Sequence, residues 1–447
     1  MGLKYIEPIK SIILLLLVLM SITFTFSIWT YSPQLAPIDQ SKTVDISIGQ
    51  QKDVKDVVKP YKFLIKYEEE LKGTTDQIAI DKILRDMGTW KVSQLLQDPT
   101  EMNKVQMKEF FEQPNQFTLY FNGQVPLPAY DEILPIDETT KKNLPEFSFD
   151  RLIVRWDPKA IAFEVHFINR ATGIHFYGKA NPADTTKSYQ SIIMESEELT
   201  HYVEVKNQEP TYLAVPDEPV PMVQKTYYQE EISPGRFRDA LFNDPNAVKR
   251  SQVDHNHEEF GDDHALMVVN TETKMLDFVH PAAEAREPAK PSDLLLDVID
   301  SINEHGGWTD SFRYSYINSL SRYVKFQLFI NGYPVHSESD ASGLTEIVQF
   351  YGDDRVFRYI RPYYTLESSL SFNENMDLPS GTNVVQSLME SEDLDFSLVE
   401  ELTVGYMMKH DLEQRIFVLE PAWFYLFKGT WKRYTPEQTG GEPFGLE

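Results

Sequence analysis

The densest group of side chains able to bind a metal ion lies between Asp254 and His264. This stretch contains five aspartates or glutamates and three histidines, His255, His257 and His264. An H-x-H pair on a strand points both imidazoles to one side, as zinc and copper sites often require, and the carboxylates could complete the ligand shell. The alternative is a mobile surface loop. We expect no metal site and keep the three histidines as candidates for a weak divalent site.

Other patterns that would support catalysis are missing from the sequence. A calcium loop does not fit, because its sixth position is Glu259 rather than Gly and its twelfth is Ala265 rather than Glu. There is no G-x-S-x-G, H-E-x-x-H, Walker or S-x-x-K motif. Paired carboxylates carry little information in a chain with 69 Asp and Glu residues. The sequence therefore predicts no catalytic residues and no cofactor.

Aromatic residues gather near the carboxyl end of the chain, at 423–427 and at Trp431. They could form a platform on which a sugar ring stacks. Alternation along a strand would instead place about half of the rings in a hydrophobic core. We expect the core arrangement and keep the sugar platform as the alternative.

A segment near the amino terminus has the length and composition of a membrane helix. Residues 11–38 contain no Asp, Glu, Lys, Arg or His, and residues 12–29 would span roughly 27 Å as a helix. The hydrocarbon core of a bilayer is about 30 Å thick. Trp29 and Tyr31 at its end suit the membrane interface and make a poor cleavage site, so we expect an uncleaved anchor.

The flanking charges predict the orientation of this anchor. Lys4 and Lys10 precede it, whereas the first charged residue after it is Asp39. Because Lys and Arg resist translocation, we expect a cytoplasmic amino terminus and an extracellular carboxyl-terminal bulk. The net charge of −27 opposes binding to nucleic acid, and the absence of cysteine removes thiolate catalysis and disulfides.

Apolar periodicity predicts an α+β fold, in which an exported three-domain region of helices packed on antiparallel sheets follows the transmembrane helix. A strand at 117–121 followed by Asn122-Gly123 predicts a hairpin. Proline-rich residues 281–291 suggest a domain boundary. The expected parts are a cytoplasmic tip and transmembrane helix at 1–35, a mostly helical domain at 36–145, a central α+β domain at 146–288, a carboxyl-terminal α+β domain at 289–436, and a tail at 437–447.

Four segments together resemble the YycH family of Gram-positive bacteria. They are Ile-Lys-Ser-Ile-Ile at 9–13, Ser-Ile-Trp-Thr-Tyr-Ser-Pro at 27–33, Asp-Val-Val-Lys-Pro-Tyr at 56–61, and Phe-Ile-Asn-Gly-Tyr-Pro-Val at 329–335. The likeness extends over essentially the whole chain in size, anchor and order of domains. No single motif is as specific as a metal signature, so the resemblance depends on the combination.

The resemblance implies a regulator rather than an enzyme. Members of the family are single-span membrane proteins that associate with a related protein, YycI, and with the sensor histidine kinase YycG, also called WalK, which controls cell-wall metabolism. The family supplies no catalytic residues that could be transferred to this sequence. The alternative functions are an exported binding protein for cell-wall polymer or another envelope ligand and, less favoured, a hydrolase of wall polymers.

Small hydroxyl residues in the predicted anchor are candidates for contact with partner helices. Ser21 and Thr25 lie one turn apart, as do Thr23 and Ser27, and the two pairs lie on roughly opposite faces of a helix. Small polar residues allow close helix approach and interhelical hydrogen bonds. The alternative is that each hydroxyl bonds the carbonyl four residues earlier in its own helix and faces lipid.

Overall fold

A computed structural model of the 447-residue protein describes residues 14–25, 47–159, 162–205, 211–338, 343–366, 369–370 and 374–436. The chain divides into two units, Met1–Asp45 and Ile46–Glu447. In the first unit, residues 14–25 form a helix with exposed side chains. Within the described ranges, no helix is both long enough and apolar enough to cross a membrane. The expected transmembrane segment, 12–29, extends beyond the described helix at both ends.

The second unit contains two large sheets, of which the first has nine strands. They are β1 (Lys62–Tyr67), β2 (Glu70–Thr74), β3 (Lys91–Gln97), β4 (Gln116–Pro126), β5 (Ser148–Asp157), β6 (Ala162–Ile168), β7 (His175–Asn181), β8 (Thr200–Glu204) and β9 (Ala214–Pro216). Their order is β3-β7-β6-β5-β4-β1-β2-β8-β9, and neighbouring strands are antiparallel.

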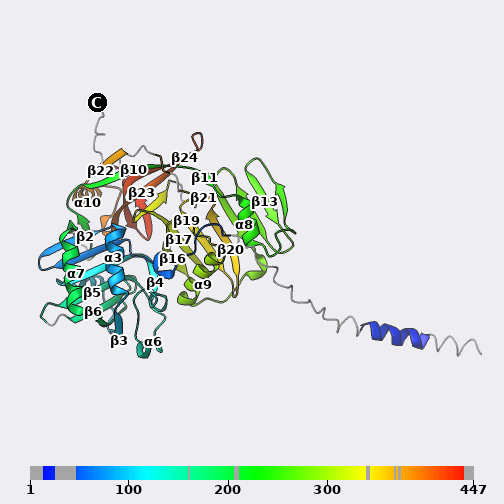
Figure 1. Ribbon diagram of the computed structural model, residues 1–447, viewed down its shortest axis with the longest axis horizontal. Helices are drawn as coiled ribbons and strands as arrows, with labels where there is room; N and C mark the ends of the chain where they lie inside the picture. The colour runs from blue at the N-terminus through cyan, green and yellow to red at the C-terminus, as the bar shows by residue number, and fades with distance from the viewer. Residues whose placement is uncertain are drawn as a thin grey trace, which may run out of the picture. The chain divides into compact units, whose positions relative to one another are not determined.

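Helices accompany this sheet between its strands. They are α2 (Val54–Val57), α3 (Gln77–Met87), α4 (Lys104–Phe111), α5 (Leu127–Tyr130), α6 (Glu138–Lys141) and α7 (Thr185–Glu197). The start of α3 is fixed by Asp76, whose carboxylate accepts a hydrogen bond from the Ala79 amide. Its buried face consists of Ile80, Ile83 and Met87, as the apolar spacing predicts. Helices α3 and α7 pack against each other (Figure 1).

The second sheet has fourteen strands. They are β10 (Val220–Tyr228), β12 (Lys249–Gln252), β13 (His257–Gly261), β14 (Leu266–Asn270), β15 (Met275–Val279), β16 (Phe312–Asn318), β17 (Tyr323–Ile330), β18 (Tyr333–Ser337), β19 (Glu346–Tyr351), β20 (Val356–Pro362), β22 (Glu374–Leu378), β23 (Val399–Asp411), β24 (Ile416–Phe427) and β25 (Thr430–Arg433). Strands β18 and β23 are parallel, and the other described neighbours are antiparallel. The short strands β11 (Glu230–Glu231) and β21 (Tyr364–Thr365) form a separate pair.

Three α-helices and two 3-10 turns complete this half of the unit. They are α8 (Pro234–Leu241), η1 (Pro281–Ala283), α9 (Pro291–Glu304), α10 (Gly381–Glu390) and η2 (Phe396–Leu398). Helix α9 packs against strands β16, β17 and β19 (Figure 1). Its buried residues include Leu295, Val298 and Ile302. The antiparallel α+β class expected from the sequence is thereby confirmed.

The pairing of strands crosses the expected domain boundaries. Residue 145 lies between β4 and β5, which are neighbours in one sheet, and residue 288 separates β15 from its partner β20. Region 36–145 was expected to be mostly helical, yet its described part also supplies β1 to β4. Sequence periodicity identifies a strand, but it does not identify the distant strand with which it pairs. The sheets therefore cross boundaries that local composition suggested.

The predicted hairpin at Asn122-Gly123 is wrong. Strand β4 continues through both residues, with a register shift against β5 between Tyr120 and Val125. A Cβ atom added to Gly123 would lie 2.2 Å from the backbone oxygen of Ser315 on β16. Glycine is required here for close approach of a second strand rather than for a turn.

The chain enters the second unit along the end of α9. The amides of Ile48 and Gly49 donate to the carbonyls of His305 and Gly306, at 3.0 and 2.6 Å. The Asn303 side chain accepts from the Lys52 amide and donates to the Lys52 carbonyl, both at 2.9 Å. Residues 48–52, the entry segment, are thus held by residues about 250 positions later.

Candidate functional site

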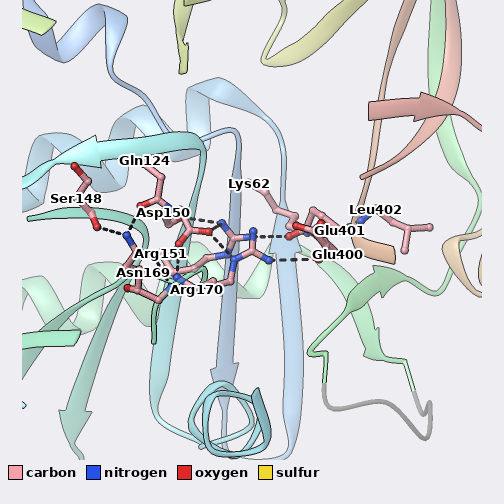
Figure 2. A network of polar contacts seen from close by, with 11 residues as sticks. Lys62, Gln124, Ser148, Asp150, Arg151, Asn169, Arg170, Glu400, Glu401 and Leu402 are labelled. Carbon is pink, nitrogen blue, oxygen red and sulfur yellow. Dashed lines mark hydrogen bonds and ion pairs between the residues drawn. The ribbon is translucent and has the colours of Figure 1, made fainter. Parts of the chain in front are cut away.

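Five charged side chains come together where the two large sheets meet. We call this group the ionic cluster: Lys62 on β1, Asp150 and Arg151 on β5, Arg170 after β6, and Glu401 on β23 (Figure 2). Lys62, Asp150, Arg151 and Glu401 are all buried. Four members come from the first half of the chain and one from near its end. The cluster is therefore a connection between the nine-stranded and fourteen-stranded sheets.

Glu401 is the member that joins the sheets. Its Oε1 accepts a hydrogen bond from the Lys62 Nζ at 2.5 Å, and its Oε2 accepts one from the Arg151 Nη2 at 2.7 Å. Both donors are cations, and charge-assisted hydrogen bonds of this kind are roughly twice as strong as neutral ones. Each carboxylate oxygen of Glu401 therefore has its own charged donor.

Asp150 forms the second carboxylate of the ionic cluster. Its Oδ2 accepts from the Arg170 Nε at 2.6 Å and from the Arg151 Nη1 at 3.2 Å, and its Oδ1 accepts from the Arg170 amide at 2.9 Å. The Arg170 Nη1 also reaches the Glu400 carbonyl on β23, at 3.3 Å (Figure 2). A second contact between the sheets thus runs through Arg170.

The electrostatic environment keeps both carboxylates ionised. Burial by itself would raise the pKa of Glu401, but the charges of Lys62 and Arg151 outweigh it and hold that pKa below its ordinary value. Burial likewise opposes ionisation of Asp150, whose pKa is nevertheless lowered by the neighbouring arginines. The Tyr120 ring lies under both cations, 4.4 Å from the Lys62 Nζ and 4.2 Å from the Arg151 Cζ.

This arrangement suits structural coupling better than proton transfer. A general base needs a free carboxylate oxygen and a pKa near the working pH. In the ionic cluster all four oxygens accept hydrogen bonds, and the pKa values move away from neutrality. Breaking a buried ion pair by removal of one partner is strongly destabilising, because it leaves an uncompensated charge. The cluster therefore fixes the two sheets relative to each other.

The histidines proposed as metal ligands are spread along a hairpin. His255 lies in the turn between β12 and β13, His257 is the first residue of β13, and His264 lies in the turn beyond its other end. His255 and His257 therefore do not form an H-x-H pair on one strand, because His255 lies in the turn before β13. The His257 Nδ1 lies 2.9 Å from Asp254, and its Nε2 lies 3.1 Å from the Asn270 amide. Among the described residues no three His, Asp or Glu side chains are grouped for a metal ion.

The four hydroxyl side chains proposed to contact partner helices belong to the first unit. The Thr23 Oγ1 donates to the Leu19 carbonyl at 2.8 Å, and the Thr25 Oγ1 donates to the Ser21 carbonyl at 2.9 Å. Ser21 lies in the same exposed helix, whereas Ser27 lies outside the described residues. Two of the four hydroxyls thus bond the carbonyl four residues earlier in their own helix, which is the alternative to contact with a partner helix.

The aromatic residues near the carboxyl end divide between the two faces of the sheet. Trp423 and Tyr425 are buried in the main core, whereas Phe424 packs on the other face with Met407 and Trp431. Alternation along β24 explains this division. The expectation that about half of these rings belong to a core is confirmed.

Comparisons with known proteins agree over nearly the whole chain. The family description "YycH protein, N-terminal domain" matches residues 7–173, and "YycH protein, C-terminal domain" matches residues 210–439. The chain is 19% identical over 430 residues to "Two-component system WalR/WalK regulatory protein YycH" from Bacillus subtilis strain 168, which covers 93% of this chain and 94% of the relative. The crystal structure of YycH from Bacillus subtilis has a TM-score of 0.72 at 17% identity and covers 87% of this chain and 99% of that one.

The solved relative shares the α+β fold of this chain, with its antiparallel sheets. The two domain matches together span most of the sequence, and this chain belongs to the YycH family.

The ionic cluster connects the two matched regions, because Glu401 lies in the second and the other four members lie in the first. The sequence carries a signal for part of the cluster. Lys62 and Arg151 each directly precede three apolar strand residues, and charged residues beside such buried runs are rarely buried without a partner. The pattern marks the residues, although it does not say which ones pair.

Proposed function

We propose that this protein regulates a two-component system without catalysing a reaction itself. The observation that carries the proposal is the full-length match to the WalR/WalK regulatory protein YycH, supported by both family domains. The match covers nearly all of both chains, so no large region of the relative is missing from the comparison. The closed hydrogen bonding of the ionic cluster is consistent with a structural rather than a chemical role.

The proposed partners are a sensor histidine kinase of the YycG/WalK kind and a YycI-like protein. A membrane anchor at residues 12–29 would hold the protein beside them, with the amino terminus in the cytoplasm and the bulk outside the cell. Exposed leucines at positions 14 to 17 in the described helix support such an environment, since a row of exposed large apolar side chains is unfavourable in water. Contacts through both the anchor and the extracellular unit would then control cell-wall metabolism through the kinase.

The test is the output of a kinase-dependent reporter in cells that lack this protein. Restoring the full-length chain should return the output to its original level. Two further forms separate the contributions: residues 1–45 alone, and residues 46–447 joined to an unrelated membrane helix. Unchanged output on deletion, together with no co-purification of a kinase, would contradict the proposal.

A further inference from the structure

A cavity of about 890 Å³ lies against the fourteen-stranded sheet, beside the small apolar cluster that contains Met407 and Phe424. Its walls come from strands β17, β18, β19, β23, β24 and β25, from the end of α10 and from the loop that follows this helix. This volume is in the upper part of the range for small-molecule sites. The cavity lies away from the ionic cluster, since no member of that cluster lines it.

The charges around the cavity balance. Three cations and three carboxylates line it: Lys325, Lys432, Arg433, Glu338, Glu346 and Asp393. The Lys325 Nζ and the Glu346 carboxylate form an ion pair at 3.0 Å. In a protein with a net charge of −27, a locally neutral lining with both donors and acceptors is notable. It favours a ligand that is uncharged and rich in groups that both donate and accept, such as hydroxyls.

Aromatic rings form one wall of the cavity. Phe424 is buried, and Trp431 is half-buried on the neighbouring strand, on the same face of the sheet. The His336 ring lies 4.3 Å from the Phe424 ring and 6.1 Å from the Trp431 ring, between centroids. Aromatic faces provide a flat apolar surface, and the indole adds one hydrogen-bond donor.

His336 contributes an unused polar atom. Its Nε2 is buried and has no hydrogen-bond partner among the described residues. Burial lowers the pKa of His336 to about 4, so the ring is neutral at physiological pH. A buried polar atom without a partner is costly. Because Nε2 exposes almost no surface, the ring contributes packing against Phe424 and Trp431 rather than a hydrogen bond to a ligand.

We propose that this cavity binds a short, uncharged oligosaccharide, with a sugar ring stacked on Trp431. The apolar face of a sugar ring suits the indole, and its hydroxyls suit the mixed donors and acceptors of the lining. This binding activity goes beyond regulation of a two-component system and does not depend on it.

The test is calorimetric titration of the purified full-length protein with chitotetraose and, separately, with cellotetraose. We expect saturable binding of at least one. Trp431→Ala should weaken it about tenfold or more, as truncation of a central Trp commonly does, and Trp431→Phe should recover part of the loss. His336→Phe, which keeps a ring beside Trp431 and removes the buried Nε2, should bind as the wild type does. Tyr228→Ala removes an exposed aromatic ring on β10 outside the cavity and should leave affinity unchanged.

Melting temperatures of all variants establish that they are folded before affinities are compared. The proposal is overturned if neither saccharide binds, or if a folded Trp431→Ala variant binds as the wild type does. A titration with tetra-alanine distinguishes a peptide site, and binding of that peptide more tightly than either saccharide would also overturn the proposal. Kinase-reporter output plays no part in these measurements, so this inference and the proposed regulation can fail separately.

Discussion

The Lys62 Nζ lies 2.5 Å from the Glu401 Oε1, although 339 positions separate the two residues in sequence. This contact joins β1 of the nine-stranded sheet to β23 of the fourteen-stranded sheet. Both side chains are almost completely buried, so water screens their attraction very little. The pair therefore holds together two regions that match different domains of the family.

Loss of the charge on Glu401 should destabilise the second unit. Glu401→Gln keeps the shape of the side chain but leaves Lys62 and Arg151 buried without their shared counter-charge. We expect the free energy of unfolding to fall by about 3 to 5 kcal/mol, the range observed when one partner of a buried pair is removed. Urea-induced unfolding, followed by fluorescence, measures the change.

A surface ion pair provides the matched control. Asp354 and Arg355 are both largely exposed, and their closest charged atoms lie 3.0 Å apart. Asp354→Asn should leave the free energy of unfolding almost unchanged, because exposed pairs contribute little. Equal effects of the two substitutions would show that the ionic cluster does not stabilise the junction.

The ionic cluster also predicts acid sensitivity. The pKa values of Glu401 and Asp150 are lowered in the folded protein, so the unfolded chain binds protons more readily as the pH falls. Their contribution to stability is complete above the ordinary values of 4.5 and 3.8 and is lost as the pH falls through the lower folded values. Unfolding measured from about pH 7 to about pH 3 should show a shallower pH dependence for Glu401→Gln. An identical slope would exclude this linkage.

Local elements could be predicted from the sequence because their causes are local. The spacing of Ile80, Ile83 and Met87 and the cap at Asp76 identify α3. Strand pairing could not be predicted in this way, as the two Asn-Gly pairs show. At Asn331-Gly332 both residues have positive φ and connect β17 to β18 in a hairpin. Asn122-Gly123 continues a strand, because Ser315 on a distant strand lies against it.

The ionic cluster could not be predicted from the sequence either, because its members also pair across long sequence distances. Lys62 and Arg151 each stand next to a run of three apolar residues in the sequence, but their partner Glu401 lies hundreds of residues away. In the histidine-rich segment, by contrast, nearness in sequence does not produce a site. His255, His257 and His264 are close in sequence, yet a turn and a whole strand separate them in space. Proximity along the chain is a poor guide to a site built across sheet strands.

The close approach at Gly123 gives a prediction about packing. Gly123→Ala would place a Cβ atom 2.2 Å from the Ser315 backbone oxygen, so β4 and β16 must move apart. We expect a loss of roughly 2 kcal/mol or more in the free energy of unfolding. Gly235→Ala is the control, because the nearest atom to its added Cβ is the Ser233 Oγ at 3.4 Å. Urea unfolding should show little change for the control, and a tolerated Gly123→Ala would refute the packing argument.

The entry segment should depend on Asn303. Its side chain makes two hydrogen bonds to the Lys52 backbone and accepts a third, at 2.8 Å, from the Trp308 Nε1. Asn303→Ala removes all three, so the amides of residues 48–50 should exchange with deuterium several-fold faster. Hydrogen exchange read by mass spectrometry tests this, with Asn375→Ala on exposed β22 as the control. Unaltered exchange at residues 48–50 would mean that backbone pairing alone holds the segment.

The proposed function leads us to expect that the anchor helix makes specific contacts with a partner helix. The Thr23 and Thr25 hydroxyls bond carbonyls of their own helix, but close approach of a partner helix depends on the small size of these side chains. Two variants test the two faces: Ser21→Leu with Thr25→Leu, and Thr23→Leu with Ser27→Leu. Leucine favours insertion while blocking close approach. At equal protein level, at least one variant should lose co-purification with the kinase or shift reporter output. Wild-type behaviour of both would show that this helix is only a tether and that residues 46–447 carry the coupling.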